Sequence, residues 1–356
     1  MRPESFEFLQ SLIATPSPSG HEAAGQRLWS NFIRPFVDDL SIDAYSNVVA
    51  KRNIGGKPHI MIAAHMDEIG LIVNHIDDRG FLKVQKIGGV NSLTLVGRQA
   101  RVQGIRESFP GVIGTAPIHL KRPDDNAIPK VEDLWIDIGA ANREEAIARV
   151  QVGATATVEQ GLEQLTEHRV CGRGLDNRSG CWIVAETARR LAEIDAPIAA
   201  EVSFVSNVME EIGTLGIRQV TAAVKPDAIV ALDVTHAMDF PGADPAQFAD
   251  IALGKGPTLT FGGLNHPSLV NALESTAKQI SIELQREAAG GRTGTDADDA
   301  FWMEGGIPSV VVGLPTRYMH SPTEVVDLRD MEQIADLLTA WIRSLTPTTR
   351  FESRAL

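Results

Sequence analysis

Histidines and carboxylates lie near the ends of several predicted strands and helices in this sequence. His65 and Asp67 directly follow one apolar run, and His320 lies in the segment after another. The carboxylates that lie near other element ends are Asp176, Glu210, Glu211 and Asp233. A set of imidazoles and carboxylates without a thiolate suits Zn²⁺, Co²⁺ or Mn²⁺ and suits a copper–thiolate centre poorly. These residue types predict a metal site with nitrogen and oxygen ligands.

The spacing of these residues allows different tasks within one site. A carboxylate such as Asp176 can bridge two metal ions through its two oxygens. Asp67 comes two residues after His65 and is placed to orient that imidazole ring. The adjacent Glu210 and Glu211 can supply one metal ligand and one base that takes a proton from an attacking water. Such a set predicts hydrolysis of a carbonyl compound with the help of two metal ions.

Each residue also has an ordinary structural explanation when it is taken alone. Asp176 can cap the N-terminus of a helix. Glu210 and Glu211 can be a solvated acidic pair, and Asp233 can open a turn. Their joint occurrence at element ends favours the metal site over these separate explanations. His236, three residues after Asp233, is a further candidate for the pocket.

Buried strands must bring these side chains to one place. Apolar runs predict strands at 58–64, 201–208, 228–232 and 309–313. Helical spacing of apolar residues predicts helices at 6–13, 180–194, 267–289 and 327–345. Ser19–Glu22 has the form of a capping box that starts one more helix. Helices that alternate with buried strands are typical of a parallel sheet, and ligands bind beyond the carboxyl ends of its strands. The site is therefore expected at that edge.

Residues 69–164 differ in pattern from the rest of the chain. Short apolar runs there are separated by turns rich in Gly and Asp, and only 142–150 has helical spacing. Many short strands at close spacing are typical of a small all-β module. We therefore predict an α/β domain made of 1–68 and 165–356, interrupted by a β domain at 69–164.

Composition limits the partners and the compartment. The chain has 33 basic and 46 acidic residues and a formal charge of −13, which disfavours nucleic acids and membrane surfaces as partners because both are polyanionic. No apolar run reaches the length of a membrane span, and no secretory apolar segment follows Met1. Two cysteines do not make a disulfide framework. These features predict a cytoplasmic protein.

Six segments together resemble one known family, the TET-type dinuclear metallo-aminopeptidases. This family includes glutamyl and deblocking aminopeptidases, and some members carry an endoglucanase label. The matching segments are Ala64–Gly70, Gly174–Arg178, Glu210–Gly213, Leu232–Thr235, Gly294–Ala297 and Pro315–Pro322. The resemblance implies a zinc-exopeptidase-like α/β fold, with a mostly parallel sheet and helices on both faces. It also implies that 69–164 form a small β-barrel that serves dimerisation and substrate access.

The resemblance also implies a role for each site residue. One metal ion takes His65, Asp176 and Asp233 as ligands, and the other shares Asp176 and adds Glu211 and His320. Glu210 is then the general base, and Asp67 orients the metal-binding histidine. Two divalent ions are expected per chain, with zinc as the first choice and cobalt or manganese as alternatives.

The activity implied by the resemblance is removal of N-terminal residues from peptides that have a free N-terminus. The same resemblance implies a homo-oligomer, a hollow dodecamer built from dimers. Gly262–Leu264 and Thr293–Asp296 are candidates for the pocket that holds the N-terminal side chain.

Other functions remain as alternatives. A related two-metal deacylase of N-acyl amino acids needs the same ligands and a different pocket. A glycoside hydrolase can use paired carboxylates but has no evident use for His65 and His320. A non-catalytic scaffold is expected to lack a ligand or the base, and none is missing here.

Overall fold

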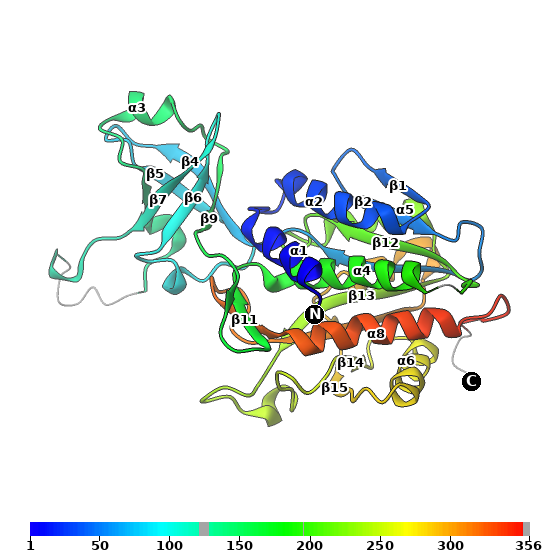
Figure 1. The fold of residues 1–356 in the computed structure, drawn as a ribbon. Coiled ribbons are helices and arrows are strands. Elements are labelled where there is room, and N and C mark those ends of the chain that lie inside the picture. The colour runs from blue at the N-terminus through cyan, green and yellow to red at the C-terminus, as the bar shows by residue number, and fades with distance from the viewer. Residues whose placement is uncertain (121–127, 195, 352–356) are drawn as a thin grey trace.

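The computed structural model describes residues 1–120, 128–194 and 196–351. It shows an α/β body and a closed barrel that projects from one end of that body (Figure 1). The body is built around an eight-stranded sheet with the order β1-β2-β12-β3-β13-β16-β14-β15. Its strands are β1 (Asp39–Ile42), β2 (Val48–Arg52), β3 (His59–His65), β12 (Glu201–Asn207), β13 (Ala228–His236), β14 (Thr258–Phe261), β15 (Gln285–Ala288) and β16 (Ser309–Thr316).

The centre of the sheet is parallel. Strand β3 lies between β12 and β13 and is parallel to both, and β13 is also parallel to β16. All seven residues of β3 are buried, as expected for a strand that is covered on both faces. The carboxyl ends of these central strands therefore meet at one edge of the sheet.

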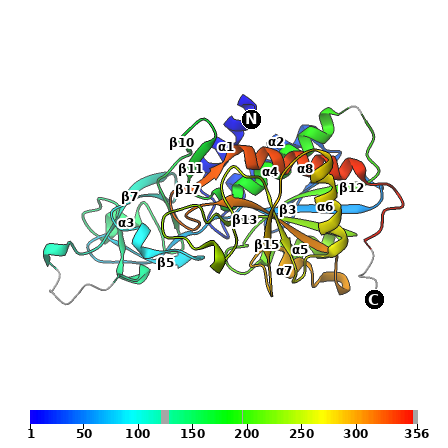
Figure 2. The same cartoon turned by 90° about the horizontal axis from the view of Figure 1, so that it is seen from below.

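Helices cover both faces of the sheet. The long helices are α1 (Pro3–Ala14), α2 (Ala23–Ile33), α4 (Leu175–Glu193), α5 (Leu215–Val224), α6 (Pro267–Gln279) and α8 (Leu328–Ser344), and α7 (Ala297–Ala300) is short. Figure 2 shows α1, α2, α4 and α8 on one face and α5 and α7 on the other. The larger core lies under the first group, and its buried residues include Trp182, Trp341, Ile60 and Ile62. A smaller core lies between α5 and the opposite face.

The barrel closes in the strand order β4-β5-β8-β7-β6-β9. Its elements are β4 (Gly70–Ile76), β5 (Leu82–Ile87), β6 (Gln99–Gln103), β7 (Ser108–Gly114), β8 (Trp135–Asp137), α3 (Arg143–Ile147) and β9 (Thr155–Val158). It has an apolar core of its own, which includes Val84, Ile113 and Ile136. A third sheet, formed by β10 (Glu163–Gln164), β11 (Arg169–Gly172) and β17 (Glu324–Asp327), lies where the chain returns to the α/β body.

Short 3₁₀ helices complete the fold: η1 (Arg34–Phe36), η2 (Ser92–Thr94), η3 (Ile118–Leu120), η4 (Val131–Asp133), η5 (Pro245–Gln247) and η6 (Met303–Gly305). Within the described residues, no helix combines the length and the apolarity that crossing a membrane requires.

Two local predictions from the sequence are wrong. The predicted helix at 267–289 ends at Gln279, and Ser281, two residues later, takes a positive φ. Gln285–Ala288 form strand β15, which pairs with β14. The capping box at Ser19–Glu22 is not formed, and α2 begins at Ala23 without a side-chain cap. The Ser19 hydroxyl instead donates to Asp67 Oδ2 at 2.6 Å. In both places a contact distant in sequence replaces the local pattern.

Candidate active site

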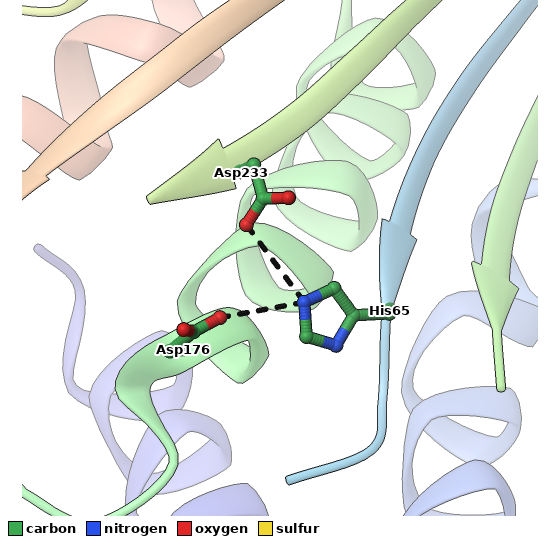
Figure 3. A group of neighbouring side chains, drawn as sticks. All are labelled: His65, Asp176 and Asp233. Atoms are coloured by element: carbon green, nitrogen blue, oxygen red, sulfur yellow. Dashed lines mark ion pairs between the residues drawn. The ribbon is translucent and has the colours of Figure 1, made fainter. Parts of the chain in front are cut away.

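The first group of site residues lies at the carboxyl edge of the sheet. His65 is the last residue of β3, Asp233 lies on β13, and Asp176 lies in the first turn of α4. The distances from His65 Nε2 are 3.3 Å to Asp176 Oδ1 and 3.8 Å to Asp233 Oδ1 (Figure 3). All three residues are buried. Among the residues that the structure describes, they form one of two groups whose potential ligand atoms lie within 4.8 Å of one another.

The second group uses the other oxygen of Asp176. His320 Nε2 lies 3.3 Å from Asp176 Oδ2 and 3.3 Å from Glu211 Oε1. Glu211 comes from the loop after β12, and His320 comes from the loop after β16. One carboxylate therefore faces a histidine on each side, which is the arrangement that a ligand shared by two metal ions requires.

In both histidines Nε2 faces the carboxylates of the site, and Nδ1 lies near a backbone carbonyl oxygen. His65 Nδ1 lies 3.2 Å from the carbonyl oxygen of Asp67, and His320 Nδ1 lies 3.2 Å from that of Gly89. A carbonyl oxygen can only accept, so each Nδ1 carries the proton in these contacts. Between Nε2 and the facing carboxylate oxygens, either a proton or a metal ion must then lie.

The pKa values are consistent with a site that attracts cations. Burial lowers the pKa of His65, but hydrogen bonds to Asp176, Asp233 and Asp67 outweigh this effect and raise it well above its usual value. Hydrogen bonds to Asp176 and Glu211 raise the pKa of His320 to about 11. Burial, together with the charge of Asp176, raises the pKa of Glu211 to about 7. The donor set and this excess of negative charge fit two divalent cations of the zinc type.

Glu210 belongs to neither ligand group. Its Oε2 lies 3.8 Å from His65 Nε2, and its carboxyl group is largely withdrawn from water. Burial, with added repulsion from Asp233, Asp296 and Glu211, raises the pKa of Glu210 to about 10. Cations bound by the two groups would lower this pKa again, and a carboxylate beside them that belongs to neither group is suited to proton transfer.

Asp67 connects His65 to the loop that carries both glutamates. Its Oδ1 lies 3.4 Å from His65 Nδ1 and accepts the backbone N–H of Glu210 at 3.0 Å. Its Oδ2 accepts from the Ser19 hydroxyl and from the backbone N–H of Glu211 at 3.1 Å. Burial raises the pKa of Asp67, but the contacts with His65 and Ser19 outweigh it and hold the pKa below its usual value.

Sequence reasoning did not find Glu324. It is buried at the start of β17, where Oε2 accepts the backbone N–H of Asp176 at 3.0 Å and Oε1 accepts that of His320 at 2.9 Å. Burial and the charge of Asp176 raise the pKa of Glu324 well above its usual value. The available sequence signal was a lone glutamate directly before the apolar pair Val325–Val326, which is too common a pattern to indicate a site.

A cavity of about 880 Å³ opens at the two ligand groups. Its further lining includes His236, as the sequence suggested, and Thr293–Thr295, three of the four residues of the predicted segment Thr293–Asp296. The other predicted loop, Gly262–Leu264, is not part of this lining. The cavity places a space for substrate next to the paired ligand groups.

The α/β fold, the inserted barrel and the paired ligand groups are together typical of metal-dependent exopeptidases. Residues 46–337 match the family described as M42 glutamyl aminopeptidase, so this chain belongs to the M42 aminopeptidases. It is similar to the lysyl aminopeptidase of Pyrococcus furiosus, with 35% identity over 348 residues, which cover 96% of this chain and 98% of that protein. The chain is therefore a peptidase of the aminopeptidase class.

Solved structures agree with this assignment. The TET aminopeptidase from the archaeon Thaumarchaeota archaeon SCGC AB-539-E09 has a TM-score of 0.92 and 30% identity, and the match covers 96% of this chain and 97% of that one. The TET1 peptidase of Pyrococcus horikoshii has a TM-score of 0.86 and 30% identity, over 96% and 100% of the two chains. That peptidase is described as assembling into a tetrahedron or a large octahedral shell. The TET-type resemblance and the fold class are confirmed.

Proposed function

We propose that this aminopeptidase removes N-terminal residues from peptides with two divalent metal ions held by the two ligand groups. His65, Asp176 and Asp233 would hold one ion, and Asp176, Glu211 and His320 would hold the other. The observation that carries this proposal is the position of Asp176, whose two oxygens face different histidines at 3.3 Å each.

When bound, such ions polarise a carbonyl group and lower the pKa of water. Glu210 accepts the proton of the attacking water and passes it to the leaving amine, which is the role its position outside both ligand groups supports. Asp67 keeps the Nδ1 proton of His65 in place and thereby keeps Nε2 directed at the ligand group. Zinc fits the donor set first, and cobalt and manganese fit it as well.

The division of the chain into a catalytic domain, 1–68 with 165–356, and an inserted domain, 69–164, is part of the proposal. The separate apolar core of the barrel supports it. We assign dimerisation and control of substrate access to the barrel, and we propose a dodecamer like the one described for PhTET1. Both cysteines are free and buried, which supports work in a reducing cytoplasm.

The test starts from protein freed of metal by a chelator and then loaded with zinc, cobalt or manganese. The loaded protein is given an aminoacyl-anilide and, separately, an N-acyl amino acid. We expect hydrolysis of the anilide only, and only with metal. Hydrolysis by metal-free protein, checked by elemental analysis, contradicts the metal assignment, and preferential hydrolysis of the N-acyl amino acid supports the deacylase instead.

A further inference from the structure

One carboxylate in the cavity has no part in either ligand group. Glu287 lies on β15 and lines the same cavity as His65, Asp176 and Asp233. Its side chain is only partly buried, so a ligand in the cavity can reach it. Neither the proton transfer nor the metal binding proposed above uses this residue.

Two threonine hydroxyls hold Glu287 in place. Thr235 Oγ1 donates to Glu287 Oε1 at 2.9 Å, and Thr260 Oγ1 donates to Oε2 at 3.1 Å. Both threonines are almost fully buried, with exposed fractions of 5% and 2%. Hydroxyl donors orient a carboxylate without cancelling its charge, and the described part of the chain places no cationic side chain in a salt bridge with Glu287.

The two arginines that line the cavity form salt bridges with carboxylates other than Glu287. Arg218 lies 3.1 Å from Asp299 Oδ2, and Arg292 lies 3.2 Å from Asp298 Oδ2 and 3.4 Å from Asp299 Oδ2. These two arginines therefore face two aspartates. Glu287 is left as a negative charge that a bound cation can neutralise.

The position of Glu287 relative to the ligand groups suits the side chain of a substrate. Thr235, which holds Glu287, lies two residues after the predicted ligand Asp233 on β13. Alternate residues of a strand point to the same side and lie about 7 Å apart. The four-carbon stem of a lysine spans a similar distance and ends in a compact ammonium group.

We propose that Glu287 binds the side-chain cation of the substrate's N-terminal residue, so that peptides beginning with Lys or Arg are preferred. This inference rests on the proposed aminopeptidase site and adds the substrate class to it. An acidic N-terminal residue is disfavoured, because its carboxylate would meet Glu287 while both nearby arginines are already paired.

The experiment compares kcat/KM for lysyl, methionyl and glutamyl p-nitroanilides, using metal-loaded protein. Met is close to Lys in length and carries no charge. The wild-type protein should prefer the lysyl over the methionyl substrate by at least about tenfold, and Glu287→Gln should reduce that ratio by at least about tenfold. Thr260→Val, which removes one donor to Glu287, should reduce the ratio by a smaller factor.

Glu283→Gln is the matched control, since Glu283 is exposed and is not part of the cavity lining. It should keep the wild-type kcat/KM for all three substrates. Metal content measured on each variant shows that the ligand groups are intact. An equal loss for all three substrates in Glu287→Gln would mean that Glu287 acts on the common α-ammonium group or on folding, and it would overturn the proposal.

A wild-type preference for the methionyl or glutamyl substrate, or a lysyl-to-methionyl ratio that Glu287→Gln leaves unchanged, overturns the proposal in the same way. These outcomes leave the aminopeptidase function standing. The function itself fails only if the metal-loaded wild type hydrolyses none of the anilides.

Discussion

Asp176 is tied to Glu324 through its backbone: the Asp176 N–H donates to Glu324 Oε2 at 3.0 Å, 148 positions apart in the sequence. The other oxygen of Glu324 accepts the backbone N–H of His320. The buried Glu324 side chain therefore fixes the relative positions of Asp176 and His320, two members of the second ligand group. Its hydrogen bonds go to their main chain, so it would position the proposed ligands without being one itself.

Glu324→Gln should weaken metal binding. An amide has one acceptor oxygen, so one of the two backbone N–H groups would face an NH₂ group instead. Loss of such a supporting contact typically lowers metal affinity by about 10–100-fold. Competition with a chromogenic chelator measures the affinity, and the exposed Glu167→Gln variant serves as the control. Unchanged metal affinity in Glu324→Gln would show that the hydrogen bonds of Glu324 to Asp176 and His320 have no positioning role.

Glu210→Gln should keep both metal ions and lose activity. The substitution preserves size but removes the base, so kcat should fall by at least about 10²–10⁴-fold. Elemental analysis of the variant beside the wild type, together with the anilide assay, checks both parts. Loss of a metal ion from this variant would assign Glu210 a ligand role.

Glu211→Gln should behave in the opposite way. An amide oxygen is a poorer ligand than a carboxylate, so the site with Asp176 and His320 should lose affinity, and excess metal should restore part of the activity. A titration of activity with metal distinguishes the two variants. If excess metal rescues Glu210→Gln and leaves Glu211→Gln inactive, the two roles are reversed.

Metal loading should release protons. The pKa of His320 is raised to about 11 and that of His65 is also raised, so both rings are protonated at pH 7 in metal-free protein. A metal ion needs neutral imidazole rings and ionised carboxylates, so His65, His320 and the partly protonated Glu211 should all release protons on loading. Apparent affinity should therefore rise with pH and fall in acid. Calorimetry in buffers of different ionisation enthalpy counts these protons, and heats that do not depend on the buffer would contradict the expectation.

Glu68→Gln should destabilise the fold. Glu68 is buried where β3 leads into the barrel, and it pairs with the buried Arg173 and Arg178. Removing its charge leaves the two buried arginines without a counter-charge, which typically lowers the free energy of unfolding by about 3–5 kcal/mol. The midpoint of thermal unfolding should fall clearly. Glu304→Gln, which breaks the exposed pair with Lys225, should change stability by less than about 1 kcal/mol.

The ion pairs of Glu68 also predict how the stability of the fold changes in acid. Burial raises the pKa of Glu68, but Arg173 and Arg178 outweigh it and hold the pKa below the ordinary value of 4.5. The folded-state pKa is the lower one, so the stabilising contribution is complete above about pH 4.5 and is lost as the pH falls further. Acid unfolding of Glu68→Gln should accordingly be less steep than that of the wild type.

The sequence alone determined much of the site, because its residues follow strong local signals. Buried strands are visible as apolar runs, and the residue at the end of such a run reaches the edge of a parallel sheet whatever the rest of the chain does. His65 at the end of β3 is the simplest case. Asp233 was expected just after its strand, and β13 in fact continues to His236, because pairing with β16 extends that far.

Only the tertiary structure decided the contacts between segments that are distant in sequence. Ser19 has a capping pattern, yet its hydroxyl donates to Asp67, 48 positions away. The segment at Gln285–Ala288 has a helical pattern, yet pairing with β14 makes it a strand and carries Glu287 into the cavity. Glu324 carries only a local pattern that is too common to indicate a site. Hydrogen bonds and strand pairing across the fold outweigh local preference wherever that preference is weak, and such contacts have no period or spacing that a sequence can display.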